Sequence, residues 1–229
     1  MENKRGGNVL EELNREDRMV GLSWVFTIGG IILGAVLGLP HAFGITAVVV
    51  ILFLIVTWRI TASPRLGWLL LFGLTAGVLE LGADWIHITQ FGSLIYTHDF
   101  GFRLLASPSY MPAGWWLTVV QFGYLALRLQ ERIPPWAAVS VVTALGMTIP
   151  PWYEEFAAPA QAWHYTTAGP MLSNTPLWII LTYGGSMLAV AASALGGYQP
   201  RSWTRALLAG CFCAVGILVS GVVGYALLG

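Results

Sequence analysis

Seven apolar segments dominate the chain, and each is long enough to cross roughly 30 Å of hydrocarbon. Only 10% of the residues are charged, against about 25% in a soluble domain. The sequence therefore predicts one all-α integral membrane domain over residues 19–229, preceded by a mixed-charge lead-in at 1–18. The predicted transmembrane helices lie near 19–39, 42–60, 66–88, 111–130, 135–152, 176–196 and 204–228.

The basic residues predict how this seven-helix bundle is oriented. Ten of the eleven Lys and Arg residues precede the first segment or lie in alternate connections, and only Arg103 lies on the other side. Positive charge gathers on the cytoplasmic side, so we expect a cytoplasmic N-terminus and an outside C-terminus, in a prokaryotic plasma membrane. The formal net charge is zero, and no basic run indicates a nucleic-acid partner. Lys4 is the only lysine, which excludes a retinal Schiff-base protein.

The third segment, which contains GVLELGADWIHI, carries the acids that lie deepest in the bilayer. At 100° per residue, Glu80, Asp84 and His87 share one helix face. A lipid-facing carboxyl costs several kcal/mol, so this face must point into the bundle. Burial disfavours the charged form of Glu80, and the second acid one turn away disfavours it further. A carboxylic acid kept protonated is what a general acid needs. The alternative is a structural carboxyl, paired with Gln121 or Tyr183.

The fifth segment ends in IPPWYEEF and supplies a second acidic cluster. Proline disrupts helix interiors, so we expect Pro150 and Pro151 to end the helix. Glu154 and Glu155 then enter a non-helical stretch, with Glu154 pointing inward; the alternative is two solvated acids.

Two long connections, roughly 89–110 and 153–175, are rich in Pro, Gly, Trp and Tyr and are expected to fold over the bundle. Their aromatic faces suit either an interfacial belt or a lid. Aromatic faces beside carboxylic acids can also stabilise a developing carbocation. The predicted substrate-binding residues are Tyr96, Gln121, Trp152, Trp163, Tyr165, Asn174 and Trp178, with possible support from His87, Asp99, Glu155 and His164.

Metal binding is a rival use of these side chains. Glu80, Asp84, His87 and His164 are ligand types that suit zinc or magnesium. No tight histidine cluster such as HExxH is present, so we predict neither a metal nor another cofactor. We also find no convincing internal repeat in the sequence.

Two stretches of the chain resemble a known enzyme group. Residues 77–127 contain FGSLIYT and SPSYMPAGWW, and residues 151–178 contain AWHY and GPMLSNTPLW. Together they resemble the membrane carotenoid hydratases of the bisanhydrobacterioruberin type, and PPWYEE is similar to the signature of the small membrane lycopene cyclases. The resemblance implies protonation of an isoprenoid double bond without a redox cofactor. Glu80, Asp84 and Glu154 are the positions that would carry that role.

The sequence thus predicts an integral membrane enzyme, a hydratase or cyclase, acting on an apolar isoprenoid or carotenoid-like lipid. Two alternatives stay open. One is a proton-coupled carrier or lipid-binding protein, which predicts polar residues continuing across the bundle to the inner side. The other is a non-catalytic membrane subunit.

Overall fold

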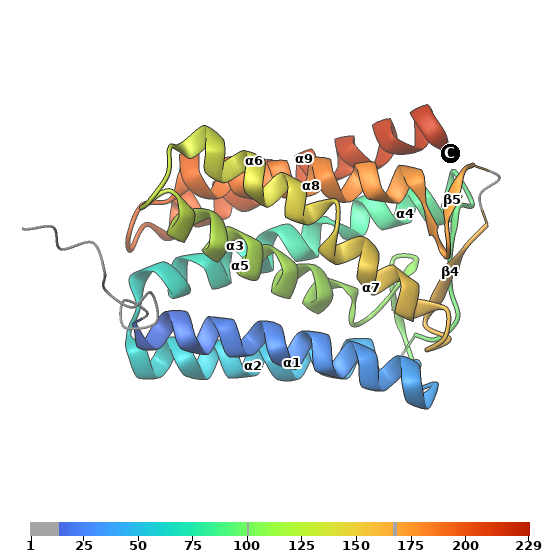
Figure 1. Ribbon diagram of the computed structural model, residues 1–229, viewed down its shortest axis with the longest axis horizontal. Coiled ribbons are helices and arrows are strands. Elements are labelled where there is room, and N and C mark those ends of the chain that lie inside the picture. The colour runs from blue at the N-terminus through green and yellow to red at the C-terminus, as the bar shows by residue number, and fades with distance from the viewer. Residues whose placement is uncertain (1–13, 100, 167–168) are drawn as a thin grey trace, which may run out of the picture.

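The computed structural model describes residues 14–99, 101–166 and 169–229. The described part is mainly helical, with short strands at one end (Figure 1). The helices are α1 Arg15–Leu37, α2 Ala42–Thr61, α3 Pro64–Leu79, α4 Leu81–Thr89, α5 Met111–Leu129, α6 Pro135–Gly146, α7 Ile149–Ala157, α8 Leu177–Gly197 and α9 Trp203–Leu228. The strands are β1 Leu94–Tyr96, β2 Arg103–Leu104, β3 Ser107–Pro108, β4 Trp163–Tyr165, β5 Met171–Leu172 and β6 Thr175–Pro176.

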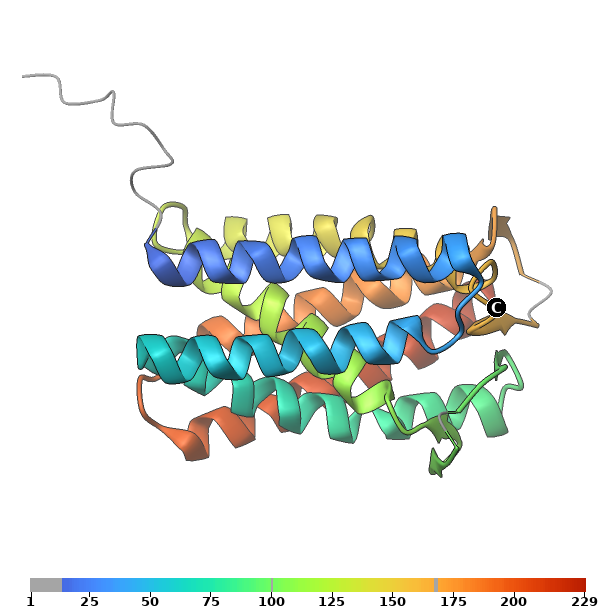
Figure 2. The same ribbon diagram turned by 90° about the horizontal axis from the view of Figure 1, so that it is seen from below.

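Five helical stretches are long and apolar enough to cross a membrane, which indicates a membrane protein and confirms the all-α class. They are α1, α2, the continuous stretch Pro64–Thr89 formed by α3 and α4, α8 and α9. The helix α5, and the pair α6 and α7, run along the same bundle without meeting these limits (Figures 1 and 2).

The first helix begins four residues earlier than expected, because its start is capped. The Asn14 side chain accepts a hydrogen bond from the Asp17 backbone N–H, and the Asp17 carboxylate accepts one from the Asn14 N–H. This reciprocal capping box satisfies two of the helix's free N–H groups. Residues 1–13 of the predicted lead-in lie outside the described residues.

The expected helix end at Pro150 and Pro151 is wrong. The helix is interrupted earlier, at Met147 and Thr148, and both prolines lie in the first turn of α7. Proline is well tolerated there, because the first N–H groups of a helix have no partner within it. Glu154 and Glu155 therefore lie on a helix rather than in an irregular stretch.

The structure contains an internal repeat that the amino-acid letters do not reveal. Each half has two consecutive helices, one strand, a two-strand hairpin and a long helix: α3, α4, β1, β2–β3 and α5, then α6, α7, β4, β5–β6 and α8. The first turn residue of each hairpin, Leu105 or Ser173, has a left-handed φ, of 55° and 54° respectively. The sequence expectation of no repeat is therefore incorrect at the level of structure.

The two halves join where β1 pairs with β4. The strands are antiparallel, and their central pair is Ile95 with His164. An antiparallel pair has a local two-fold axis through its centre, so Tyr96 in one half is equivalent to Tyr165 in the other. We call the end of the bundle that carries the six strands the strand end; the C-terminus also lies there (Figure 1).

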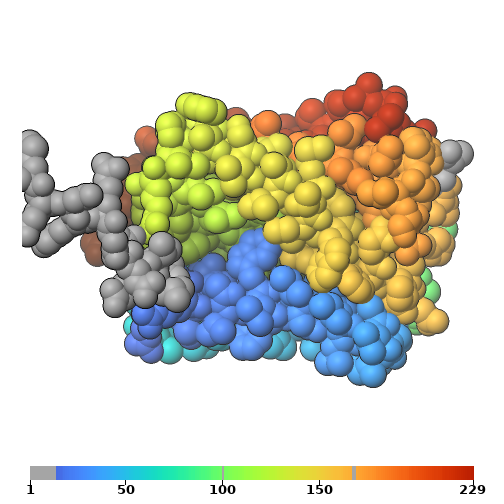
Figure 3. All heavy atoms as spheres, in the orientation of Figure 1, coloured from blue at the N-terminus to red at the C-terminus, as the bar shows by residue number. Residues whose placement is uncertain are grey.

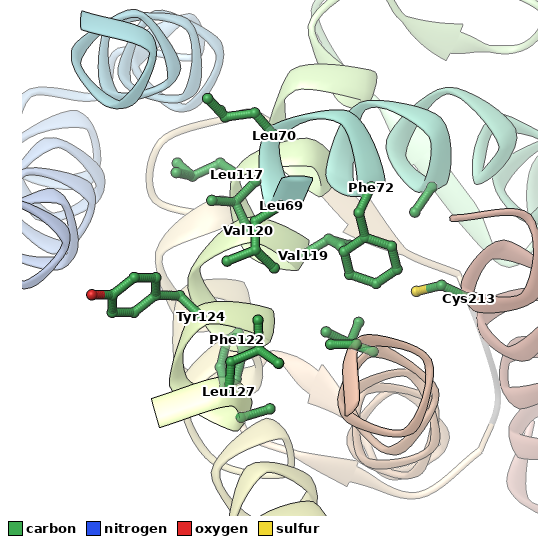
Figure 4. Close-up of a cluster of buried hydrophobic side chains, with 14 of the residues drawn as sticks. Leu69, Leu70, Phe72, Leu117, Val119, Val120, Phe122, Tyr124, Leu127 and Cys213 are labelled. Carbon is green, nitrogen blue, oxygen red and sulfur yellow. The ribbon is translucent and has the colours of Figure 1, made fainter. Parts of the chain in front are cut away.

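The core lies where α3, α5, α8 and α9 meet. Figure 4 shows Phe72 of α3 and Cys213 of α9 directed toward each other, with Leu69 of α3 and Val119 of α5 beside Phe72. The hairpin of α1 and α2 packs on this core from one side, chiefly through α2 against α5. The atoms of α7 lie directly against those of α1 on the face seen in Figure 3. The space between the hairpin and the core is where the cavity described next is found.

Candidate functional site

A cavity of about 150 Å³ lies in the half of the bundle near the strand end. Its wall is formed by α1 and α2 on one side and by α4, α5, α7, α8 and α9 on the other. Three acids, Glu80, Asp84 and Glu154, line it, and all three side chains are buried. The rest of the wall is mostly aromatic and aliphatic, including Phe43, Trp115, Trp163, Trp178 and Ile217. The acids from the two halves of the chain therefore meet in one apolar chamber.

Glu80 and Asp84 form a pair. Glu80 lies at the junction of α3 and α4, and Asp84 lies one turn further along. The two carboxyl groups are buried close together, and each affects the protonation of the other. Because two carboxylates this close in an apolar site repel each other, the arrangement favours one proton on the pair.

The partners of Asp84 place that proton on Glu80. Asp84 Oδ2 accepts hydrogen bonds from Tyr96 Oη and Ser107 Oγ, each at 2.8 Å. Hydrogen bonds of this kind stabilise a carboxylate. By contrast, Glu80 Oε2 is buried and has no hydrogen-bond partner among the described residues. Asp84 is therefore the better anion, and Glu80 the better acid.

Glu154 has the opposite surroundings. Its Oε2 accepts from Trp163 Nε1 at 2.6 Å and from Tyr165 Oη at 2.9 Å, and its Oε1 accepts from Tyr183 Oη at 2.6 Å. Three donors converge on one buried carboxyl group; these hydrogen bonds favour its ionised form, while burial disfavours it. The cavity thus has a pair of acids on one side and a single acid with three hydrogen-bond donors on the other.

The tyrosines of the paired strands act as donors in both halves. Burial raises the pKa of Tyr96, and the nearby Asp84 carboxyl raises it further. Burial and Glu154 likewise raise the pKa of Tyr165. Both phenols therefore remain protonated, so each keeps donating to its acid.

His87 lines the same cavity one turn beyond Asp84. Its ring stacks on the Trp178 indole, with centroids 4.8 Å apart and planes 12° from parallel. Nδ1 lies 3.2 Å from Ser93 Oγ, and Nε2 is buried without a partner among the described residues. Gly221 of α9 lies opposite Nε2.

Of the predicted substrate-binding residues, Tyr96, Trp163, Tyr165 and Trp178 line the cavity. The other three lie outside it. Gln121 is buried between α5 and α1, where its Nε2 donates to Ser23 Oγ and Thr27 Oγ1. Trp152 is 40% exposed and packs on Tyr153 and Phe156. Asn174 is exposed at the strand end.

Of the predicted supporting residues, only some lie in the cavity wall. His87 lines the cavity, whereas Glu155 faces away from it and bonds to Thr175 Oγ1 at 2.7 Å. Asp99 forms a surface ion pair with Arg103, and the Gly101 N–H lowers its pKa. His164 is exposed on β4. Neither alternative partner considered for Glu80 bonds to it in the described structure, since Gln121 bonds to α1 and Tyr183 to Glu154.

Sequence reasoning missed several members of the site. Tyr183 was considered only as a partner for Glu80, and Ser107, Tyr153 and Trp115 were not considered. The Trp115 indole stacks on Tyr183, with centroids 5.8 Å apart, and so helps to hold that donor. No sequence signal identifies Ser107, because only the packing of β3 against α4 brings it to Asp84.

The described residues include no group of three or more His, Cys, Asp or Glu side chains arranged to hold a metal ion. The cavity itself offers acids, phenols, indoles and an imidazole.

The model of one protein family, DUF6989, described as a domain of unknown function, matches residues 81–228. That range covers more than half of the chain. The chain belongs to the DUF6989 family. The family region includes Asp84, His87 and Glu154, and it begins at the residue after Glu80. No curated protein and no solved structure matches the chain.

Proposed function

We propose that the protein is an integral membrane enzyme that protonates a carbon–carbon double bond of an isoprenoid-like lipid. The observation that carries the proposal is the Glu80–Asp84 pair facing the same apolar cavity as Glu154. A protonated acid beside a carboxylate and aromatic faces can both form a carbocation and stabilise it.

The proposed reaction uses the two sides of the cavity differently. The O–H bond of Glu80 breaks as a C–H bond forms on the substrate, which leaves a positive charge on the adjacent carbon. The Glu154 carboxylate and the Trp163 and Trp178 rings stabilise that charge. Either water then adds to the cation, or a second double bond closes a ring. In both cases a proton is lost from the product and returns to the Glu80–Asp84 pair. The products are a hydrate or a cyclic isomer.

The size of the cavity supports a substrate that enters by one end. A cavity of about 150 Å³ takes up a benzene molecule, so this one holds about six carbons. A second hollow of about 290 Å³ lies beside α2 and also includes Tyr110 in its wall. By the same ratio it holds about twelve carbons. Its wall is apolar, with Ile45, Val48, Val49 and Phe102, and suits the remainder of the chain.

We also propose that all seven predicted segments span the membrane, with the strand end outside and the opposite end in the cytoplasm of a prokaryotic cell. Crossings by α5 and by the α6–α7 pair would be added to the five apolar stretches, giving seven spans. The charge distribution supports the orientation. Ion pairs of Arg65 and Arg128 with Glu131, and of Arg128 with Asp17, lie at the end opposite the strands.

The direct test is expression in hosts that make lycopene or shorter polyprenoids, followed by mass analysis of the extracted lipids. A hydratase yields a product heavier by one water, and a cyclase yields an isomer. Glu80→Gln should abolish either product, whereas Glu155→Gln, the same chemical change outside the cavity, should not. Unimpaired turnover by Glu80→Gln would refute the proposed acid.

One observation favours a second candidate, a proton-coupled carrier. The buried polar side chains Ser23, Thr27 and Gln121 are joined by hydrogen bonds, and Thr27 also lines the cavity. Towards the opposite end, Tyr124 Oη donates to Asp17 at 2.6 Å. These polar side chains extend from the cavity towards the end of the bundle opposite the strands. Proton flux in liposomes that is lost in Gln121→Leu would favour the carrier over the enzyme.

A further inference from the structure

His87 is an imidazole in the cavity wall, near the acids, that the proposed reaction leaves without a role. It lies on the same helix as Asp84 and is buried, with 6% of its surface exposed. Its neighbours determine which ring nitrogen carries the proton.

The Nδ1 side of the ring is occupied by a donor–acceptor chain. Ser93 Oγ donates to the backbone carbonyl of His87 at 3.3 Å, which uses the only hydrogen of that hydroxyl. The Ser93 oxygen, 3.2 Å from Nδ1, is then left to accept. This hydrogen-bond chain assigns the proton of the neutral ring to Nδ1 and leaves Nε2 a free lone pair.

The Nε2 side of the ring lies against α9 at Gly221. A Cβ atom built on Gly221 would lie 2.7 Å from Nε2, closer than real contacts allow. Both residues line the cavity, and because residue 221 is glycine, it has no side chain to cover the lone pair. Stacking on Trp178 holds the ring in this orientation.

We propose that His87 is the general base of this site, a role that rests on the proposed function. In hydration, the water O–H bond breaks as its oxygen bonds to the cation, and the proton passes to Nε2. In cyclisation, a C–H bond beside the cation breaks, its electrons form the new double bond, and Nε2 takes that proton. Return of the proton to the Glu80–Asp84 pair restores the starting state in both cases.

The first test needs no substrate. Nitrogen NMR of the full-length protein, labelled at its four histidines and held in lipid nanodiscs, reports the protonation of each ring nitrogen. The signal lost in His87→Gln identifies this residue. We expect a neutral ring with the proton on Nδ1; a proton on Nε2 would overturn the assignment.

The second test separates the base from the acid by turnover in a polyprenoid host. General bases contribute about 10²–10⁴-fold, so His87→Gln should lower turnover by that factor. Gly221→Ala should do the same with the histidine intact, because its methyl group covers Nε2. Gly196→Ala, which meets nothing within 4 Å, is the matched control.

The outcomes distinguish the two proposals. If Glu80→Gln is inactive but His87→Gln and Gly221→Ala turn over like the wild type, the base is wrong and the enzyme stands. If Glu80→Gln is fully active, the proposed function itself fails.

Discussion

A methyl group added at Gly77 should force α3 and α5 apart. The Cβ of Gly77→Ala would lie 2.5 Å from the Pro112 carbonyl oxygen and 2.7 Å from the Trp116 backbone nitrogen. Because these are backbone atoms of a helix, no side chain can rotate away. The two helices must separate by about 1 Å to restore a normal contact distance. Overpacking of this kind costs about 1–3 kcal/mol.

Gly82→Ala provides the matched control, because a Cβ there meets nothing within 4 Å. Both substitutions gain about 1 kcal/mol of helix propensity, so this gain cancels in the comparison. We therefore expect the free energies of unfolding to differ by about 1–3 kcal/mol, with Gly77→Ala the less stable. The assay is reversible unfolding in mixed micelles on titration with dodecyl sulfate, followed by tryptophan fluorescence.

The same displacement should affect the site, since Glu80 lies three residues after Gly77. We expect Gly77→Ala to lose product formation even where it remains folded, while Gly82→Ala keeps it. Equal unfolding free energies for the two variants would refute the close approach of α3 and α5 at this point.

Three further predictions concern other contacts. Tyr183→Phe removes one of three hydrogen-bond donors to Glu154. Because a hydrogen bond to a charged group contributes about 1.5–3 kcal/mol, turnover should fall about ten- to a hundredfold. An unchanged initial rate would contradict an ionised Glu154. Val48→Trp fills the hollow beside α2, so product yield should fall for long polyprenoids and persist for ten-carbon ones; an equal loss for both would place the chain elsewhere. Arg128→Gln breaks the partly buried ion pair with Asp17 that joins α5 to α1. Titration with dodecyl sulfate should show a free energy of unfolding lower by about 1–3 kcal/mol. A free energy of unfolding equal to that of the wild type would show that the pair is energetically neutral.

The all-α class could be predicted from the sequence because the length and apolarity of a segment are simple constraints. The helix face with Glu80 was expected to point inward, since lipid cannot solvate a carboxylate, and Glu80 is buried in the cavity wall. The inward direction of Glu154 was predicted from a helix end at Pro150 and Pro151; that helix end is wrong, but Glu154 is buried in the cavity wall. The prolines misled because proline interrupts a helix interior but suits a first turn.

The details of the site could not be predicted, because they depend on pairing between distant segments. Tyr96 and Tyr165 become equivalent only when β1 lies beside β4, and strands of three residues carry almost no periodic signal. Gln121 and Tyr183 illustrate the same limit. Each is a polar residue on an apolar helix, and only the helix packing decides which one reaches an acid.

The two structural repeats contribute different acids to the cavity. Asp84 precedes its tyrosine donor by 12 residues and Glu154 by 11, so the two acids are counterparts. One helical turn before each lies Glu80 in the first half and Pro150 in the second. An ancestor made of two identical halves would carry two identical acids around its axis. The difference at this position gives the first half a second acid, so the chamber has a pair of acids on one side and a single acid on the other.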